Sequence, residues 1–473
     1  MDTIHRIRGE TKVLSDRLRT KFAGLDVRTP VSVAPHAAEG ANFFVSPEHA
    51  AQRLMEYVER GASKVAIQFT APQDIKDYPA GVEGLSRWGV ANDSSAMSKG
   101  FKYLYATGEE KACIGRRDVG LKTIELLKEQ VPEGVLVEAD IVGGSMDPSA
   151  ADSWAAMARE FEAAGADVIE CDTSCDVFAY DESAEWGALK TAGFPNQQIG
   201  DNEAALKELC STVSKAIEIP FGWKMTPETG WPRFLYLAKA SLDNGATWVA
   251  VHNCNILLSA VDIYNDGKPD QEAFPFAPVN TPVASTGYGR ATGRRATAAI
   301  CNWVPDIEVI GITGITKPEY AVEYLMLGAQ IVELASGIFF YGPEFIDKTV
   351  RFIDRFLEDG GYDNVDRIRG RALAHTNWDG SAFDFKYGQL TARIDKSACI
   401  ACKRCGGTVC FAIGHDEDGI AEVDEQTCAG CGLCVAVCPS GAAKLYERDE
   451  PKVLDYARGI PALGEMIKWD GQR

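Results

Sequence analysis

The sequence lacks any stretch of about 20 consecutive apolar residues, the length that a helix needs to cross a bilayer. Residues 1–21 are rich in charge and lack the apolar run of a secretory signal. Basic residues are scarce, with 48 Lys and Arg against 68 Asp and Glu, giving a net charge of −20. So acidic a chain repels nucleic acid and anionic membrane surfaces. We therefore expect a cytoplasmic protein with neither a nucleic-acid nor a membrane partner.

Cysteine, in contrast, is plentiful. Fourteen cysteines without a secretory signal indicate a reducing compartment, where clustered thiols bind metal rather than pair. Two runs near the C-terminus read C-x2-C-x2-C-x4-C and C-x2-C-x2-C-x3-C-P, and the second is the pattern of bacterial two-cluster ferredoxins. In that pattern the fourth cysteine of each run ligates the other cluster. We expect two [4Fe–4S] clusters, one held by Cys399, Cys402, Cys405 and Cys438 and the other by Cys428, Cys431, Cys434 and Cys410.

The first run has one residue more than usual before its last cysteine. A one-residue bulge, a three-iron cluster or an otherwise altered cluster could follow from this. Zinc is the alternative metal because it also binds four thiolates, but two interlocked runs, the second ending in Cys-Pro, favour iron and sulfide. By itself this segment predicts an electron carrier and does not name a reaction.

The long N-terminal part repeats a helix that ends in Gly-Ala, followed by an apolar strand, at Gly61, Gly165, Gly245 and Gly328. Glycine just past a helix end takes the left-handed conformation, and the β-branched run after it is typical of a buried strand. Strand and helix alternate about eight times, the rhythm of an α/β fold of the (β/α)8 TIM barrel type. A doubly wound sheet is the alternative, but the glycine fingerprint that it normally carries after its first strand is missing.

The expected domain order follows from these two patterns. It is an N-terminal extension (1–27), a (β/α)8 barrel (28–365), a linker (366–393), a small α+β domain like bacterial ferredoxin (394–447) and a C-terminal tail (448–473).

Residues just past the C-terminal ends of barrel strands form the active site in this fold. Here those positions hold small or polar residues: Ala34, Pro35, Ser145, Asp172, Cys175, His252, Asn253, Cys254, Thr313, Gly314, Ser336 and Gly337. The last strand ends contain glycine and suit phosphate binding by backbone N–H groups. Lys224 lies within an apolar strand, where a lone lysine is costly unless it meets an anion or a substrate; a lysine snorkelling from the strand end is the alternative.

The motifs W-K-M-T-P at 223–227 and V-H-N-C at 251–254, the strand ends at 311–315 and 335–338, and the two cysteine runs resemble the pyrimidine-reducing part of the dihydropyrimidine dehydrogenase family. The barrel alone also resembles dihydroorotate dehydrogenase. The resemblance implies FMN in the barrel, with Lys224 as the cation beside the flavin. It implies further cofactor contacts from Ala34, Pro35, Gly289, Gly293, Thr313, Gly314, Ser336 and Gly337, and a substrate contact from Asn253.

The departures from the family concern the substrate side. Gln68 replaces a family lysine after the second strand, Asp172 replaces a substrate-binding asparagine, and Gln198 stands about where a catalytic cysteine or serine is expected. Glutamine cannot act as a general acid, which favours a substrate other than a pyrimidine. We expect Gln68 at the cofactor and Ser145, Asp172, Asn253 and Cys254 at the substrate. The proton would come from His252, Cys175 or Tyr180.

The expected function is that of an oxidoreductase that depends on FMN and iron–sulfur clusters. It would reduce, or in reverse oxidise, a C=C bond conjugated to a carbonyl in a cyclic substrate, with electrons passing through the two clusters. Three alternatives stay open: a dihydropyrimidine dehydrogenase subunit acting on uracil or thymine, a non-catalytic electron-transfer subunit, and an aldolase-type lyase with a Schiff base on Lys224. Because a dinucleotide fingerprint is missing, we expect a separate NAD(P)H-oxidising flavoprotein subunit or a ferredoxin as electron partner. The resemblance also suggests a homodimer.

Overall fold

The protein is described here from a computed structural model. It describes residues 14–35, 46–67, 70, 87–92, 102–107, 117–142, 150–174, 199–226, 229–252, 255–256, 261–264, 266, 268–269, 283–376, 378, 389–406 and 410–448. The chain divides into two compact units, 1–91 with 102–376 and 92–101 with 377–473.

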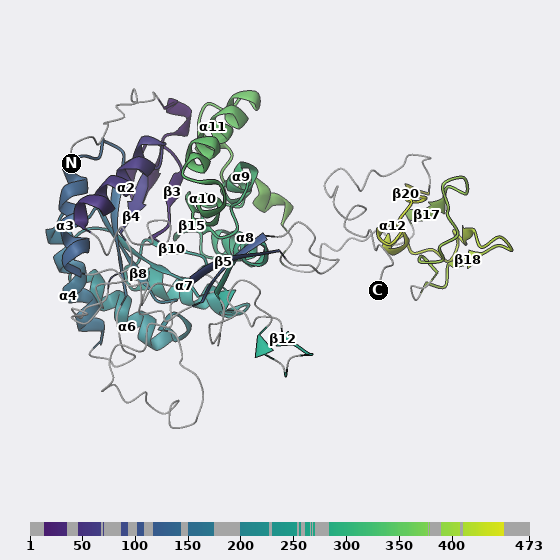
Figure 1. Cartoon of the computed structure of the whole chain (residues 1–473), viewed down its shortest axis with the longest axis horizontal. Helices are drawn as coiled ribbons and strands as arrows, with labels where there is room; N and C mark the ends of the chain where they lie inside the picture. The colour runs from purple at the N-terminus through teal and green to yellow at the C-terminus, as the bar shows by residue number, and fades with distance from the viewer. Residues whose placement is uncertain are drawn as a thin grey trace. The chain divides into compact units, whose positions relative to one another are not determined.

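The first unit contains a closed barrel of parallel strands (Figure 1). In order around the barrel they are β3 (Val31–Val33), β4 (Lys64–Ala66), β7 (Leu136–Ile141), β8 (Val168–Asp172), β9 (Phe221–Lys224), β10 (Trp248–Ala250), β15 (Glu308–Ile312) and β16 (Ile331–Leu334). Every neighbouring pair is parallel, including β16 with β3, which closes the ring. The predicted TIM barrel is therefore confirmed.

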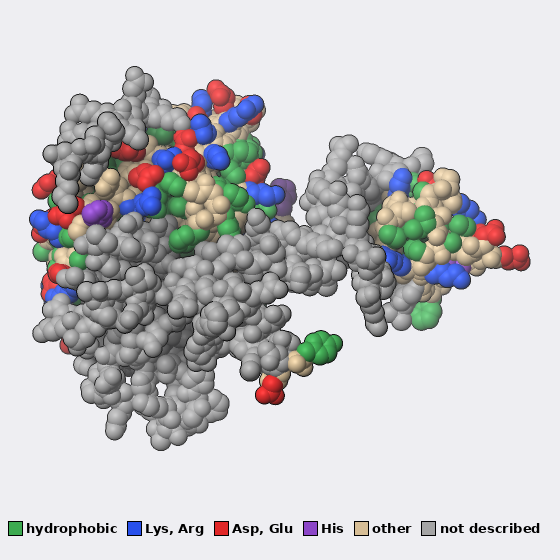
Figure 2. All heavy atoms as spheres, in the orientation of Figure 1, with side chains coloured by type: hydrophobic (Ala, Val, Ile, Leu, Met, Phe, Trp, Pro, Cys, Tyr) green, Lys and Arg blue, Asp and Glu red, His purple; other side chains and the backbone are tan. Residues whose placement is uncertain are grey.

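Helices surround this barrel (Figure 1). They are α2 (Pro47–Glu59), α3 (Arg117–Lys128), α4 (Ala150–Ala163), α6 (Glu203–Ser214), α7 (Arg233–Asp243), α8 (Gly287–Trp303), α9 (Pro318–Met326), the short α10 (Ser336–Tyr341) and α11 (Glu344–Asp359). Short 3-10 turns are found at Asp16–Leu18, Ile199–Asp201, Val365–Arg367 and Arg371–His375. Where the described helices reach the surface, acidic and basic side chains are interspersed (Figure 2).

The Gly-Ala turns take the conformation that the sequence required. Gly61, Gly165, Gly245 and Gly328 have φ angles of 109°, 102°, 101° and 105°. Side chains resist such values, so these glycines let each helix stop and the chain turn directly into the next strand.

The amino end of the barrel is plugged by a hairpin of β1 (Thr20–Phe22) and β2 (Leu25–Val27). Its Phe22 packs on Trp248, with ring centroids 5.0 Å apart. Trp248 in turn occupies the space over Gly222, where any Cβ would collide with the indole. Aromatic side chains thus fill this end, and the chemistry is left to the carboxyl end.

Two small sheets come from loops that follow barrel strands, and the sequence did not reveal them. One has the order β11 (Asn255–Ile256), β14 (Val283–Thr286), β6 (Lys102–Thr107) and β5 (Arg87–Asn92). The other pairs β12 (Val261–Asp262) with β13 (Lys268–Pro269).

The second unit is a small α+β domain of ferredoxin type. It pairs β17 (Leu390–Ile394) with β20 (Ala443–Glu447) and β18 (Ile413–His415) with β19 (Ala421–Val423), and adds the short helix α12 (Leu433–Ala436). Its hydrophobic core cluster comprises Ala392, Cys434, Ala443 and Leu445, against which further cysteines pack. Across both units, none of the described helices combines the length and the apolarity that a membrane span demands.

Candidate functional site

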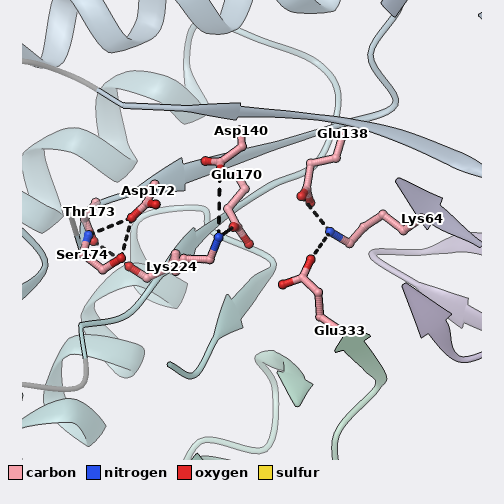
Figure 3. Close-up of polar contacts among 9 residues, drawn as sticks. All are labelled: Lys64, Glu138, Asp140, Glu170, Asp172, Thr173, Ser174, Lys224 and Glu333. Carbon is pink, nitrogen blue, oxygen red and sulfur yellow. Dashed lines mark hydrogen bonds and ion pairs between the residues drawn. The ribbon is translucent and has the colours of Figure 1, made fainter. Parts of the chain in front are cut away.

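Charged side chains fill the middle of the barrel. Among the described residues, two lysines and five carboxylates lie buried on its strands and converge on one another (Figure 3): Lys64, Glu138, Asp140, Glu170, Asp172, Lys224 and Glu333. On β7 and β8 the carboxylates alternate with apolar residues, so all of them project to the inner face. The sequence analysis singled out Lys224 and Asp172 but missed the other five members of this group, although the two-residue spacing on β7 and β8 was a usable signal.

The part of the group nearer the amino end of the barrel, here called the lower part, is centred on Lys64, the first residue of β4. The upper part lies nearer the carboxyl end. The Nζ of Lys64 lies 2.6 Å from Glu138 Oε1 on β7 and 2.8 Å from Glu333 Oε1 on β16. The three side chains are at most 1% exposed. Because a buried charge is tolerated only when it is paired, these contacts hold three strands of the barrel together.

The upper part is centred on Lys224, at the carboxyl end of β9. Its Nζ lies 2.6 Å from Glu170 Oε1 and 3.7 Å from Asp140 Oδ2. The lysine side chain is 3% exposed, so it does not snorkel to solvent. The carboxyl groups of Glu170 and Asp140 therefore supply part of the negative charge that a buried Lys224 requires.

Among the described residues of this interior, carboxyl groups outnumber lysines, and the pKa values of several carboxyl groups are raised. Burial raises the pKa of Glu138 to about 8, against the pull of Lys64. Burial also raises the pKa of Asp140 well above its ordinary value and that of Glu170 in the same direction, although Lys224 opposes both shifts. Burial therefore favours the retention of protons within this group.

Asp172 ends β8 and lies opposite Lys224 in the strand register. Its Oδ1 accepts hydrogen bonds from the backbone N–H of Ser174 at 3.0 Å and from the Ser174 hydroxyl at 2.5 Å. Thr173 donates to the backbone carbonyl of Lys224 at 2.9 Å. These bonds fix the carboxylate and the end of β9 beside each other, at the carboxyl-end rim of the barrel.

The turn after β15 and helix α8 together form a cradle. Thr313 and Gly314 have φ angles of 80° and 67°. A Cβ on Gly293 would lie 2.8 Å from Thr313 Cγ2 and 2.6 Å from the Tyr324 hydroxyl, so only glycine fits there. The buried hydroxyl of Thr313 has no hydrogen-bond partner among the residues that the structure describes. An unsatisfied donor beside a glycine-lined turn fits an anion such as the phosphate of FMN.

His252 is buried at the end of β10 and is tied to helix α8. Its Nε2 lies 2.9 Å from the Thr292 hydroxyl, which donates to the Gly289 carbonyl at 2.9 Å. The Thr292 hydroxyl donates to one acceptor at a time; when it donates to the Gly289 carbonyl, Nε2 donates to Thr292. The imidazole is thereby oriented against the helix that also carries Gly293.

The remaining site predictions divide into two groups. Ala34 and Pro35 are buried directly after β3, and Ser336 and Gly337 begin α10 directly after β16. Several residues lie outside the described part of the chain: Gln68, Ser145, Cys175, Tyr180, Gln198, Asn253 and Cys254.

In the second unit the eight cysteines gather into two sets. Cys399, Cys402, Cys405 and Cys438 line one cavity. Burial raises the pKa of the Cys434 thiol to about 11, and the nearby thiols that add to the effect are Cys428, Cys431 and Cys410. Each set joins three cysteines of one run to the last cysteine of the other, and none of the eight forms a disulfide.

The two cysteine loops share a backbone conformation. Positive φ angles occur at Ala401 (53°) and Lys403 (56°) in the first loop and at the equivalent Gly430 (69°) and Gly432 (76°) in the second. Backbone N–H groups reach sulfur in the second run, as from Ala392 to Cys428 Sγ at 3.4 Å. Four converging thiols with N–H donors around them fit the donor set of a [4Fe–4S] cluster.

A TIM barrel with a charged, buried carboxyl end, followed by a ferredoxin-type domain, defines an iron–sulfur oxidoreductase. The model of a 4Fe-4S binding domain matches residues 420–443.

The relatives specify the type of oxidoreductase. The NAD-dependent dihydropyrimidine dehydrogenase subunit PreA of Escherichia coli is 28% identical over 344 residues, which cover 69% of this chain and 75% of PreA. The catalytic subunit of dihydroorotate dehydrogenase B (NAD(+)) from Methanothermobacter thermautotrophicus is 26% identical over 277 residues, 57% of this chain and 78% of that subunit. Chloroplastic dihydropyrimidine dehydrogenase (NADP(+)) of Arabidopsis thaliana is 22% identical over 269 residues, which cover 54% of this chain and 56% of the plant enzyme. The resemblance seen in the motifs is confirmed: the chain is related to the dihydropyrimidine and dihydroorotate dehydrogenases and is an oxidoreductase acting on CH–CH groups.

Proposed function

We propose that this chain is the catalytic subunit of an enzyme that transfers electrons between two [4Fe–4S] clusters, a barrel-bound FMN and a cyclic substrate. The substrate carries a C=C bond conjugated to a carbonyl, which the enzyme reduces or, in reverse, forms. FMN, when bound, supplies the conversion between one-electron transfer with the clusters and two-electron transfer with the substrate. The observation that carries this proposal is a buried cation, Lys224, at one strand end and an unsatisfied, glycine-lined hydroxyl, Thr313, at another.

The cofactor site is assigned to residues on the strand ends. Thr313 and the backbone N–H groups of the glycine-containing turns would bind the phosphate, and Lys224 would contact the electron-rich edge of the ring. Contacts with the remaining parts of FMN are assigned to Ala34, Pro35, Gln68, Gly289, Gly293, Gly314, Ser336 and Gly337.

The substrate would lie between the ring and Asp172, whose carboxylate Ser174 already orients. Ser145, Asn253 and Cys254 are proposed to contact the substrate. The proton donor is proposed to be His252, Cys175 or Tyr180. The hydrogen bond between Nε2 and Thr292 holds the His252 ring in one orientation. A proton donor needs such a fixed orientation towards its substrate.

The electron route is proposed to continue into a second protein. PreA is named as a subunit of an NAD-dependent enzyme, and the archaeal relative as the catalytic subunit of an NAD(+)-dependent one. We therefore propose an NAD(P)H-oxidising flavoprotein subunit, or a ferredoxin, as electron partner of a homodimer of this chain.

The test is anaerobic purification with flavin extraction and iron analysis, followed by a screen of cyclic enones, hydroxylated aromatics and pyrimidines with an artificial electron donor. We expect FMN and about eight iron atoms per chain, the content of two [4Fe–4S] clusters. A colourless protein without flavin contradicts the proposal. Turnover of uracil or thymine supports a second candidate, a dihydropyrimidine dehydrogenase subunit, which the 28% identity to PreA favours.

A further inference from the structure

Two buried carboxyl groups have no role in the function proposed above. Asp140 on β7 and Glu170 on β8 are opposite one another in the strand register, and both are fully buried. Both face the Nζ of Lys224 (Figure 3). Neither oxygen of Asp140 accepts a hydrogen bond from any residue that the structure describes. A polar group left so poorly satisfied in a rigid strand needs an explanation.

The charge on this pair cannot be balanced if both carboxyl groups are ionised. Lys224 offers one positive charge, closer to Glu170 (2.6 Å) than to Asp140 (3.7 Å). Two adjacent carboxylates in a low-dielectric interior favour retention of a proton by one of them. The pair and its lysine are therefore neutral when the pair holds one proton.

The other charged groups around the pair are already committed. Lys64 is bound between Glu138 and Glu333 in the lower part of the barrel, so its charge acts on Glu170 less than that of Lys224 does. Asp172 accepts two hydrogen bonds from Ser174. Lys224 is consequently the main cation on which the charge of the pair depends.

We propose that the Asp140–Glu170 pair takes up a second proton when an FMN bound above Lys224 is reduced. This inference rests on the proposed function, because a reduced ring competes with the carboxylates for the positive charge of Lys224. When Lys224 pairs with the ring, the remaining carboxylate loses its partner and is neutralised by a proton from solvent.

The proton count matches the reaction. Two electrons arrive through the clusters; one proton goes to the flavin and one to the carboxyl pair. Saturating a C=C bond consumes those two electrons and two protons: one proton is transferred with the electrons as hydride to one carbon, and the proposed donor (His252, Cys175 or Tyr180) protonates the neighbouring carbon. When the flavin is reoxidised the pair releases its proton, which balances the proton that the donor must take up again, and the charge beneath Lys224 returns to its starting value.

The first test measures how the two-electron midpoint potential of bound FMN depends on pH in the full-length protein. Each proton taken up with two electrons contributes about 30 mV per pH unit, since a tenfold change is 29.6 mV for such a couple. We expect a slope of about 60 mV per pH unit in the wild type and about 30 in the double variant Asp140→Asn, Glu170→Gln. The matched control is Glu138→Gln, which removes a carboxyl group beside Lys64 and leaves the wild-type slope.

A second measurement needs no variant that could fail to fold. The infrared difference spectrum of reduced minus oxidised wild-type protein should show a new carboxylic C=O stretching band that shifts in D2O. A flavin-loaded wild type with a slope near 30 mV per pH unit and no such band overturns the inference and leaves the proposed function standing. A chain that binds no FMN overturns the proposed function and the inference with it.

Discussion

At the scale of single residues, the barrel interior combines a lysine at a strand end with acids beneath it. Lys224 has the environment of a cation that is partly neutralised from below by Glu170, 2.6 Å away. Glu170 and an anionic ligand above Lys224 therefore compete for the same positive charge. Lys224 stabilises such a ligand less than an isolated lysine would.

The first prediction concerns Lys224→Met. Removing the cation removes its attraction to the reduced flavin, so the midpoint potential of bound FMN should fall by about 30 mV or more, which corresponds to about 1.4 kcal/mol for a two-electron couple. Reductive titration with an artificial donor measures it. The control is Lys207→Met, an exposed helix lysine paired with Glu203, which should leave the potential unchanged. An unchanged potential in Lys224→Met would remove Lys224 from the flavin site.

The second prediction concerns pH and stability at Glu138. Its pKa rises from an ordinary 4.5 to about 8 on folding. Between these values the folded state binds more protons than the unfolded state, so the free energy of unfolding falls as the pH rises from 4.5 towards 8. Glu138→Gln keeps the neutral shape and should lose part of this dependence, on the order of 1 kcal/mol per pH unit.

Denaturant titrations of the wild type and Glu138→Gln at pH 5.5, 6.5 and 7.5 check this. Lys64 keeps Glu333 as its partner in the variant, which protects it from an unpaired buried charge. Parallel stability curves for the two proteins would show that Glu138 is ionised throughout.

At the scale of elements, the glycine after each helix decides where the next strand begins. The third prediction is that Gly245→Ala destabilises the barrel by about 1–3 kcal/mol, because it forces a side chain to a φ of 101° and into the Ser214 side chain. The control is Gly230→Ala, at an exposed glycine whose Cβ would have no neighbour within 4 Å. The difference between their thermal midpoints measures the effect, and equal midpoints would contradict it.

The elements also show how far the sequence could lead. The barrel could be predicted because one local rule, a glycine in the left-handed conformation at a helix end, repeats along the chain. It repeats at Gly61, Gly165, Gly245 and Gly328. The sheet that contains β5 and β14 obeys no local rule, since it joins one part of the chain, 87–107, to another far away in sequence, 255–286. Short strands of two to six residues have too little periodicity to be recognised alone.

The site was predictable to a similar degree. Cysteine spacing and strand-end position pointed to the thiols, to Lys224 and to Thr313, because both patterns are carried by the chain itself. Lys64 was passed over because its partners, Glu138 and Glu333, lie 74 and 269 residues away in sequence. Pairing across a closed barrel becomes visible only when the register of the strands is known.

At the scale of the whole molecule, the two units differ in what holds them together. The barrel has a large apolar core that includes Trp154, Trp223, Phe161 and Leu54. The core cluster of the second unit comprises four small or medium side chains, one of which is the proposed cluster ligand Cys434. A unit of this size buries too little apolar surface to be stable alone, so metal binding supplies much of its folding free energy.

The fourth prediction is that removing the clusters unfolds the second unit and leaves the barrel folded. After oxidative treatment with an iron chelator, limited trypsin digestion should cleave rapidly within 389–448, at sites such as Arg404 and Lys444, while the barrel persists as a protected fragment. Protein kept anaerobic without chelator is the control and should resist cleavage in both units. Equal protection of 389–448 before and after iron loss would mean that the thiols pack as an ordinary core. The second unit would then fold without its clusters.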